Sequence, residues 1–244
     1  MKKPILLLAG LALVFSSLAH AEPLRIATEG AYPPFNMKSA SGELGGFDVE
    51  IAKALCAEMK RECTIVDQDW DGIIPGLVNN KYDAIIASMS ITPERKETID
   101  FTDHYYSNYI GIIAPTKSAL KVDDLASKTV GAQRSTVAAQ WSEDKYGRRG
   151  DVRLYDTQTA AYADLEAGRI DALVSDFLPA SDWLKDKADY AFIGPKIDID
   201  DKIGVGIRKG EEDLKQAINA AIKAIRANGV YQKINAKYFS TDIY

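Results

Sequence analysis

The sequence predicts an α/β fold of two similar lobes that face each other across a cleft. Strand-like apolar runs alternate with helical runs in two successive series, which is the signature of parallel sheets with crossover helices. The phrase KYDAII at residues 81–86 is echoed by RIDALV at residues 169–174, one in each series. Polar residues follow strands in both series, and clefts between domains are favoured sites for small ligands. The pattern therefore indicates a ligand site between the lobes.

Residues 1–21 have the composition of a secretory signal peptide. Lys2 and Lys3 give a positive start, an apolar run extends from Ile5 to Leu18, and Ala19-His20-Ala21 is a small–x–small cleavage pattern. The apolar run is too short for a comfortable membrane span, and no cysteine follows the cleavage pattern to carry a lipid. We therefore expect cleavage after Ala21 and a soluble product, with no transmembrane helix later in the chain.

Length and charge exclude several classes of partner. The chain has 244 residues and a formal net charge of −5, which becomes more negative once Lys2 and Lys3 leave with the signal peptide. This length suits one large or two medium domains. The acidic balance argues against nucleic acid and anionic membrane surfaces as partners.

Cys56 and Cys63 are the two cysteines, and in an oxidising compartment a disulfide between them is the default.

No metal or cofactor is expected. Zinc needs three or four ligands, and no histidine lies near the two cysteines in the sequence. Asp198, Asp200 and Asp201 lack the regular spacing and the glycine of a calcium loop, so we interpret them as a charged crossover.

The first series contains three strands and two helices. The strands are expected at residues 24–28, 63–66 and 82–87. Asp48 opens the first helix, whose apolar residues recur at the helical period, and a second helix begins at Ile73. Loops are expected between these elements at 29–35 and 68–72, with a turn at 42–46. The loops follow strands, and ligands bind at the carboxyl ends of strands in open α/β sheets.

The second series repeats this order before the chain ends in helices. Its strands are expected at residues 129–132, 153–155 and 170–174. Its helices are expected from 133–137 onward, at 157–167, at 213–228 and, as a short final segment, at 231–238. Hydroxyls cap the first of these helices, and Gly168 and Gly229 end the next two.

Residues 87–95, at the end of the third strand, contain several hydroxyl side chains, a proline and an arginine. Ser88 and Ser90 offer hydroxyls, and Arg95 carries a planar fork of donors that pairs with carboxylate in bidentate fashion. The stretch is therefore suited to hold a carboxylate. A polar turn before a short helix, with Pro93 at the first helical position, is the alternative interpretation.

Several motifs in register resemble one known family, the extracellular solute-binding proteins of polar amino acid ABC transporters. The likeness begins with GFDVEI at residues 46–51 and covers nearly all of residues 24–241. The other motifs are YPPF at 32–35, WDGIIP at 70–75, SMSITPER at 88–95, AGRIDA at 167–172 and GVGIRK at 204–209. The chain is most similar to the lysine/arginine/ornithine- and histidine-binding members, with octopine- and nopaline-binding relatives close behind.

The resemblance implies a two-lobed, type II periplasmic-binding-protein-like fold that closes on one amino acid. Lobe one would comprise residues 24–107 and 204–244, and lobe two residues 112–196, with hinges near 107–111 and 198–203. The protein would be a periplasmic monomer that delivers its ligand to an inner-membrane permease.

The resemblance also implies roles for individual residues at the two ends of a bound amino acid. Arg95 would grip the α-carboxylate, helped by Ser90, by the helix cap at Ser135 and Thr136, and by backbone N–H groups. Asp176 would take the α-ammonium. A zwitterion needs a cation and an anion, and these two residues sit on different lobes, so ligand contacts would favour the closed state.

The remaining roles concern the ammonium end and the ligand side chain. Ser88 would share the ammonium end, Tyr32 and Trp70 would sandwich the aliphatic part, and Glu29 would receive a cationic end. Aromatic faces suit an alkyl chain or a guanidinium. A buried carboxylate without a cationic partner is costly, which disfavours a neutral ligand. A basic amino acid is therefore expected.

The choice among basic ligands stays open. Glu29 stands where the basic-ligand members usually have a shorter aspartate, and Val137 replaces a polar residue. Arginine, lysine, ornithine, histidine and a bulkier opine of the octopine or nopaline type all remain candidates. A cyclohexadienyl-dehydratase-like enzyme on the same fold is a further alternative, for which Glu29 is the one candidate acid or base.

Overall fold

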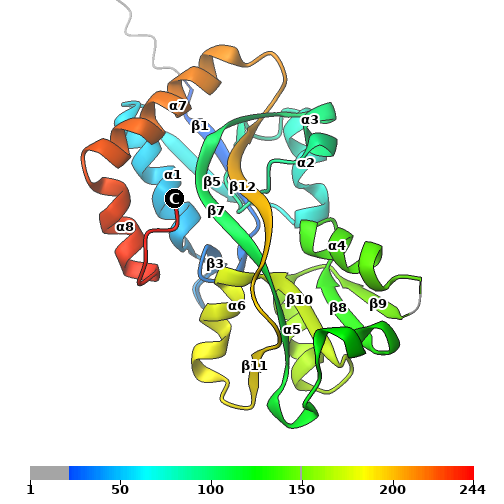
Figure 1. Ribbon diagram of the computed structural model, residues 1–244. Coiled ribbons are helices and arrows are strands. Elements are labelled where there is room, and N and C mark those ends of the chain that lie inside the picture. Colours follow the sequence, from blue (N-terminus) through cyan, green and yellow to red (C-terminus); the bar gives the residue numbers. More distant parts are fainter. Residues whose placement is uncertain (1–21, 149) are drawn as a thin grey trace, which may run out of the picture.

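The computed structural model describes residues 22–148 and 150–244, so the predicted signal peptide lies outside the described residues. The chain forms two lobes joined by two long strands, β7 (Asp100–Pro115) and β12 (Ile197–Ile207), which run side by side from one lobe into the other (Figure 1). Among the helices of the described part, none combines the length and the apolar character needed to cross a membrane.

Within the described residues, nine strands form one sheet that continues through both lobes. Its order is β5-β1-β6-β12-β7-β10-β8-β9, and β11 pairs with β7 off this path. In lobe one the strands are β1 (Leu24–Thr28), β5 (Cys63–Asp67) and β6 (Ala84–Ile85). In lobe two they are β8 (Thr129–Gln133), β9 (Asp151–Tyr155), β10 (Ala172–Asp176) and β11 (Tyr190–Phe192). β1 pairs in parallel with β5 and β6, and β8 pairs in parallel with β9 and β10, which confirms the predicted α/β class.

A second, smaller sheet occupies the segment for which a loop and a turn were expected. It consists of β2 (Ala31–Tyr32), β3 (Asn36–Lys38) and β4 (Leu44–Gly45), paired antiparallel. Gly30, at a φ of 73°, turns the chain into it. The prediction was wrong here because strands of two or three residues are too short to show an alternating pattern.

Helices cover both faces of the sheet in each lobe. They are α1 (Phe47–Glu58), α2 (Trp70–Val78), α3 (Pro93–Thr98), α4 (Val137–Tyr146), α5 (Gln158–Glu166), α6 (Phe177–Trp183), α7 (Glu212–Ala227) and α8 (Val230–Tyr238). Short 3-10 turns lie at η1 (Thr116–Ser118), η2 (Val122–Ser127) and η3 (Leu184–Asp186). Thr92, Thr136 and Thr157 cap α3, α4 and α5 by accepting a backbone N–H three residues on.

Several boundaries differ from the prediction, and the start of α2 is one of them. α2 begins at Trp70 rather than at Ile73. The prediction placed the start too late because the first turn of the helix is polar and aromatic, so the apolar period becomes visible only from Ile73. The segment interpreted as a charged crossover is the first part of β12, in which Ile197 and Ile199 alternate with the exposed Asp198 and Asp200.

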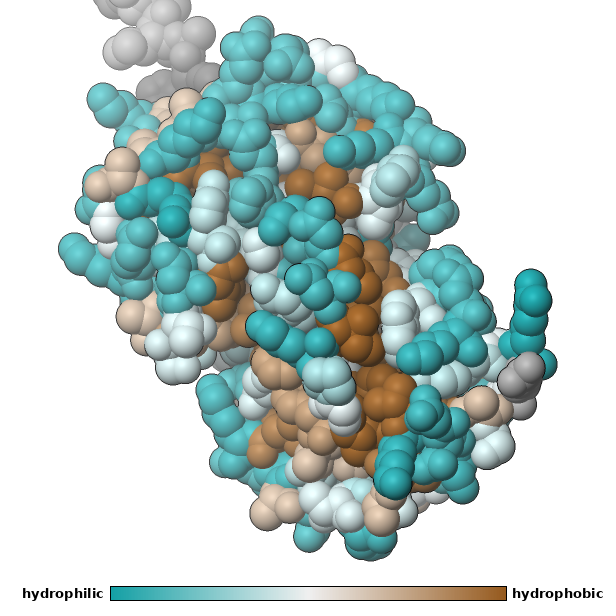
Figure 2. Space-filling model, in the orientation of Figure 1, coloured by the Kyte–Doolittle hydropathy of each residue, from teal (hydrophilic) through white to brown (hydrophobic). Residues whose placement is uncertain are grey.

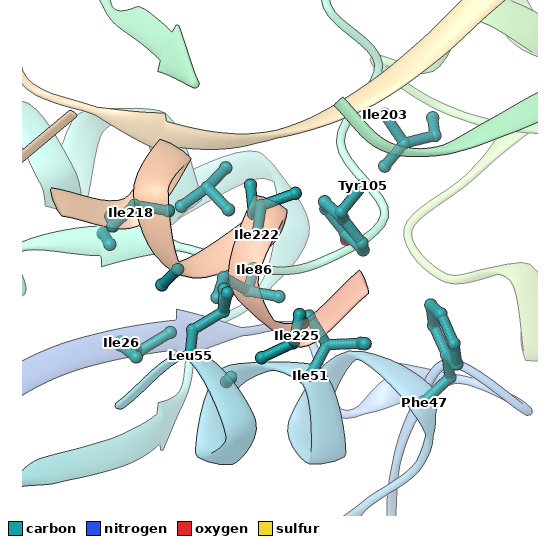
Figure 3. Packing of buried hydrophobic residues seen from close by; sticks show 14 of the residues in the cluster. Ile26, Phe47, Ile51, Leu55, Ile86, Tyr105, Ile203, Ile218, Ile222 and Ile225 are labelled. Carbon is teal, nitrogen blue, oxygen red and sulfur yellow. The ribbon is translucent and has the colours of Figure 1, made fainter. Parts of the chain in front are cut away.

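In lobe one, successive residues of a strand pack into separate cores on the two faces of the sheet. Ile26 of β1 packs with Ile51 and Leu55 of α1 and with a row of α7 isoleucines, shown in Figure 3. The next residue, Ala27, belongs to a separate cluster with α2 on the opposite face. Lobe two is built alike, with α4 on one face and α5 and α6 on the other.

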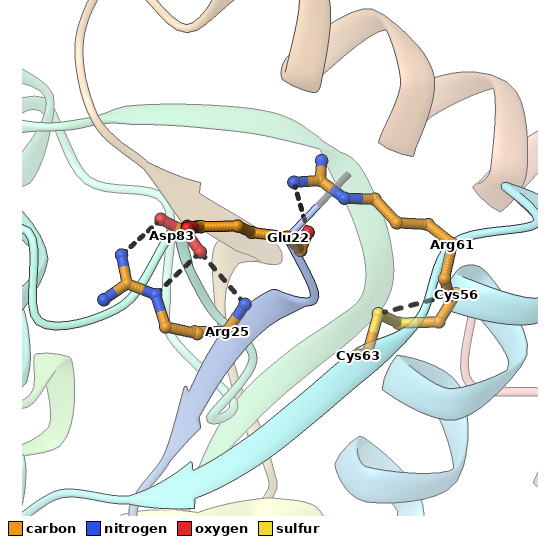
Figure 4. Close-up of a disulfide and its surroundings, with 6 residues drawn as sticks. All are labelled: Glu22, Arg25, Cys56, Arg61, Cys63 and Asp83. Atoms are coloured by element: carbon orange, nitrogen blue, oxygen red, sulfur yellow. Dashed lines mark hydrogen bonds and ion pairs between the residues drawn. A yellow bond between two sulfur atoms is a disulfide. The ribbon is translucent and has the colours of Figure 1, made fainter. Parts of the chain in front are cut away.

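The predicted disulfide between Cys56 and Cys63 is present and joins the end of α1 to the start of β5 (Figure 4). Closing this short loop stabilises the fold by about 2–3 kcal/mol on a chain-entropy basis.

Near the disulfide, Arg25 donates to Asp83 through Nε and Nη2 at 3.1 and 2.8 Å, which connects β1 to the start of β6. Burial alone would raise the pKa of Asp83, but the hydrogen bonds from Arg25 and Arg208 lower it to about 2.

Candidate ligand-binding pocket

A small pocket lies between the two lobes. Lobe one supplies Glu29, Tyr32, Trp70, Ala87, Ser88, Ser90 and Arg95, and lobe two supplies Gln133, Thr136, Val137 and Asp176. All of the predicted ligand-binding residues except Ser135 line this pocket. Figure 2 shows apolar surface where the lobes meet, and a wider groove there shares Trp70 and Arg95 with the pocket.

Arg95 points into the space between the lobes from α3. Its Nη1 donates to the Ser90 carbonyl and its Nη2 to the Ser135 carbonyl, each at 2.8 Å. The guanidinium carbon also lies 5.3 Å from the centre of the Trp70 ring. Burial lowers the pKa of Arg95, and no ion pair of residues 22–148 and 150–244 includes it. A cation held by carbonyls is suited to accept an anionic group.

The N-terminus of α4 adds to the positive character of this end. Thr136 and Val137, the cap and first residue of the helix, both line the pocket. Thr136 Oγ1 accepts from the Ala139 N–H at 3.1 Å and donates to the Gln133 carbonyl at 2.7 Å, so its proton is already used. Helix N-termini favour anions through free N–H groups and the helix dipole.

Ser135 lies beside the pocket rather than in its wall. Its backbone is left-handed, at a φ of 57°, and its hydroxyl donates to Asp71 Oδ1 at 3.1 Å. Its carbonyl accepts from both Arg95 and Trp70 Nε1. Ser135 therefore positions the two side chains that line the pocket and directs its own hydroxyl away from it.

Asp176 ends β10 on the opposite lobe and is buried. Tyr32 donates its hydroxyl to Asp176 Oδ2 at 2.5 Å, directly across the cleft. Burial raises the pKa of Asp176, and the nearby charge of Asp201 raises it further. A carboxylate in this setting is stabilised by a cation.

Glu29 lies at another end of the pocket, one residue after β1. Gln133 Nε2 donates to Glu29 Oε1 at 2.7 Å, and both side chains are buried. Burial raises the pKa of Glu29 to about 7, even though the Gln133 hydrogen bond acts in the opposite direction. Within the described part of the chain, Glu29 takes part in no ion pair.

Tyr32 and Trp70 form walls between these charged groups. They are only 7% and 9% exposed, and Trp70 Nε1 donates to the Ser135 carbonyl at 3.2 Å. Because both rings line the pocket while their polar atoms are already hydrogen-bonded, they present apolar faces to it. Such faces suit a chain of methylene groups.

Two polar residues were not among the predicted ligand-binding residues: Gln133, which lines the pocket, and Asp201, which contacts the pocket residue Ser90. Gln133 was assigned to the start of a helix, although it is the last residue of β8, a position where strand ends carry ligand contacts. Asp201 was grouped with the charged crossover, but it is buried and accepts from Asn108 Nδ2 at 2.9 Å and Ser90 Oγ at 3.2 Å. No sequence signal distinguished it from Asp200.

No group of three or more His, Cys, Asp or Glu side chains within residues 22–148 and 150–244 is arranged to hold a metal ion. The side chains that line the pocket show which ligand chemistry it suits. It combines one guanidinium, two buried carboxylates and apolar walls, which suits a small molecule with charges of both signs and a flexible chain.

Comparisons of this chain with family models, known sequences and solved structures all point to the same kind of protein. Residues 24–241 match the model for the bacterial extracellular solute-binding proteins, family 3. The L-arginine-binding protein of Pseudomonas aeruginosa is 42% identical, over 99% of this chain and 98% of the relative. The histidine-binding periplasmic protein of Escherichia coli K12 is 38% identical, over 100% and 99%. The solved structure of an ancestral arginine-binding protein bound to arginine has a TM-score of 0.85 at 32% identity, covering 91% of this chain and 100% of that one.

Proposed function

Because the chain belongs to family 3 of the bacterial extracellular solute-binding proteins, we propose that it is the periplasmic binding component of an ABC importer for a basic amino acid. It collects arginine, lysine, ornithine or histidine and delivers the ligand to an inner-membrane permease. The names of two relatives, which bind arginine and histidine, support this ligand class. The protein acts as a monomer, after cleavage of its signal peptide behind Ala21.

The observation that carries the proposal is the buried, unpaired carboxylate of Glu29. The α-carboxylate and α-ammonium of an amino acid neutralise Arg95 and Asp176, which leaves Glu29 without a partner. A neutral side chain would bury this carboxylate uncompensated, or force it to bind a proton. A basic side chain supplies the missing cation, so the charges of ligand and pocket balance.

The remaining contacts follow from the hydrogen bonds described above. Arg95 and the N-terminus of α4 bind the α-carboxylate, while Asp176 and Ser88 bind the α-ammonium. Ser90 was expected to help hold the α-carboxylate, but its hydroxyl donates its proton to Asp201. Its side chain therefore offers the ligand only lone pairs, which suit the α-ammonium. Tyr32 and Trp70 enclose the methylene chain between the two ends.

An opine of the octopine or nopaline type is the second candidate ligand. A further open space, lined by Asp69, Asp156 and the Asp71–Arg134 ion pair, continues outward from Glu29 and Trp70. This space would accommodate the additional groups of an opine. Such ligands therefore belong in the same screen as the free amino acids.

We propose binding without catalysis. Glu29 and Asp176 both line the pocket with pKa values raised to about 7, which suits a general acid, but Arg95 and Asp176 together hold a whole amino acid. Incubation with prephenate or arogenate should give no aromatic product. Steady turnover of either compound would overturn this part of the proposal.

Thermal unfolding of the chain from Glu22 onward tests the ligand class. We expect arginine or another basic ligand, at about 1,000 times its Kd, to raise Tm by about 10 °C, while citrulline and glutamine have little effect. Arg95→Ala should abolish the shift, because it removes the partner of the α-carboxylate. If no basic amino acid or opine shifts Tm, the ligand class is wrong.

A further inference from the structure

Behind the pocket wall, the carboxylate of Asp48 is completely buried in lobe one. It accepts three side-chain hydrogen bonds, from Asn36 Nδ2 at 2.8 Å, Ser88 Oγ at 2.9 Å and the Tyr105 hydroxyl at 2.8 Å. No ion pair of the described residues includes it. Its place in the first turn of α1 favours negative charge. Asp48 does not line the pocket, but Ser88 does.

The contact with Asp48 determines what Ser88 offers to a ligand. A serine hydroxyl has one proton and two lone pairs. Because Ser88 donates its proton to Asp48, only lone pairs remain for the pocket. The backbone of Ser88 is held as well, in a left-handed conformation with a φ of 53° and with its N–H donating to the Tyr105 hydroxyl at 3.2 Å. The serine therefore presents a fixed acceptor.

Asp48 is itself fixed from the other side. Asn36 donates to Asp48 through Nδ2, and its Oδ1 accepts from the Gly30 N–H at 2.8 Å. The Asp48 N–H donates to the Phe35 carbonyl at 2.7 Å. With Asn36 and Tyr105 both donating to it, the carboxylate has one orientation, and the position of the Ser88 proton follows from that orientation.

We propose that Asp48 is a positioning residue of the ligand pocket, which takes the Ser88 proton so that the Ser88 hydroxyl accepts from the ligand α-ammonium. This inference rests on the proposed function, since it assigns an ammonium to that place. Stabilisation of the fold alone would not require the carboxylate: burial raises the pKa of Asp48 to about 6 despite its three donors, so the charge is costly there.

A mutant cycle with Ser88 tests the proposal, using calorimetric Kd values for arginine. Asp48→Leu removes every acceptor, so Ser88 can turn its proton into the pocket, and we expect binding about 30-fold weaker. Asp48→Asn keeps one carbonyl oxygen for that proton and should lose only about 3- to 10-fold. Ser88→Ala should lose about tenfold, and adding either Asp48 substitution to it should cost less than about threefold more.

Two comparisons separate positioning from a purely structural role. 5-Guanidinopentanoate is arginine without the α-amino group, and Asp48→Asn should change its Kd by less than about twofold. Asp83→Asn is the matched control, because Asp83 lies in the same lobe, pairs with Arg25 and does not touch the pocket. It should lower Tm and leave the arginine Kd within about twofold of the unmodified protein.

Distinct results would overturn the proposal. Fold losses that multiply in the double variants, or equal losses for arginine and its deamino analogue, would show that Asp48 does not act through Ser88. A lower Tm with an unchanged Kd would leave it a structural residue. If Asp48→Leu does not fold, Asp48→Asn with the two ligands decides. Failure of the unmodified protein to bind arginine or any other basic ligand would instead reject the proposed function.

Discussion

Glu29 is the residue at which ligand choice is decided under the proposed function. Arg95 and Asp176 contact groups that every amino acid has, whereas Glu29 faces the part that differs. Its side chain is buried, and the one side chain of the described residues that donates to it, Gln133, is neutral. The site is therefore sensitive to a single charge at this position.

Glu29→Gln should exchange the preference between arginine and its neutral isostere, citrulline. The substitution removes the carboxylate while keeping its size, so we expect arginine to bind about 30- to 100-fold more weakly, in line with loss of a buried hydrogen-bonded charge pair. Citrulline should bind as well as before or better. Calorimetric Kd values for both ligands provide the measurement. Similar losses of affinity for arginine and citrulline would mean that Glu29 determines the shape of the pocket and does not recognise the ligand charge.

The raised pKa of Glu29 gives arginine binding a defined pH dependence. Burial raises that pKa from 4.5 to about 7, and the charges of Asp69 and Asp71 act in the same direction, so the folded protein holds a proton that the unfolded chain has lost. Stability of the protein alone should therefore decrease as pH rises from about 4.5 to 7. A cationic ligand favours the ionised carboxylate, so affinity for arginine should rise over the same interval.

Proton release measures this linkage directly. Calorimetry near pH 6.5 in buffers of different ionisation enthalpy should show that arginine binding releases a proton. Asp176, whose pKa burial also raises, titrates beside Glu29, so the comparison with Glu29→Gln is required. The variant should release less. Equal proton release from both proteins would assign the titration to Asp176.

At the scale of elements, the carboxyl ends of strands bring the site together. Glu29 follows β1, Ser88 follows β6, Gln133 ends β8 and Asp176 ends β10. These strands lie in two lobes, but all four ends meet at one pocket. This is the general rule for open α/β sheets, and together with the family resemblance it made Glu29, Ser88 and Asp176 predictable from the sequence.

Elements without a distinct local pattern could not be predicted. The small sheet of β2, β3 and β4 has strands of two or three residues, and its pairing depends on contacts that no period records. Asp201 was indistinguishable from Asp200 in the sequence, since only the pairing of β12 with β7 decides which of them turns inward. Gln133 lacks a charge or a ring that would have marked it.

At the scale of the molecule, the pocket exists only where both lobes contribute. Tyr32 reaches Asp176, Gln133 reaches Glu29, and Arg95 reaches the Ser135 carbonyl, each across the cleft. The covalent connection between the lobes runs through β7 and β12, whose register shifts between Ile197 and Asp201 and again beyond Ile203. Irregular pairing of this kind lets two strands bend where a regular ladder would resist.

A ligand held by both lobes should stabilise their closed arrangement. Arg95 and Asp176 belong to different lobes, so an amino acid can neutralise both only when the cleft is closed, and its binding energy favours that state. Cysteines placed at the exposed Val78 of α2 and Lys145 of α4 can carry a dye pair for single-molecule energy transfer.

Saturating arginine should convert the energy-transfer distribution of this dye pair to one narrow high-transfer population. Asp176→Ala, which removes the lobe-two anion, should leave the distribution unchanged at the same arginine concentration. If calorimetry shows arginine bound while the distribution of the unmodified pair does not change, the ligand does not drive closure, and the two lobes form a fixed cleft.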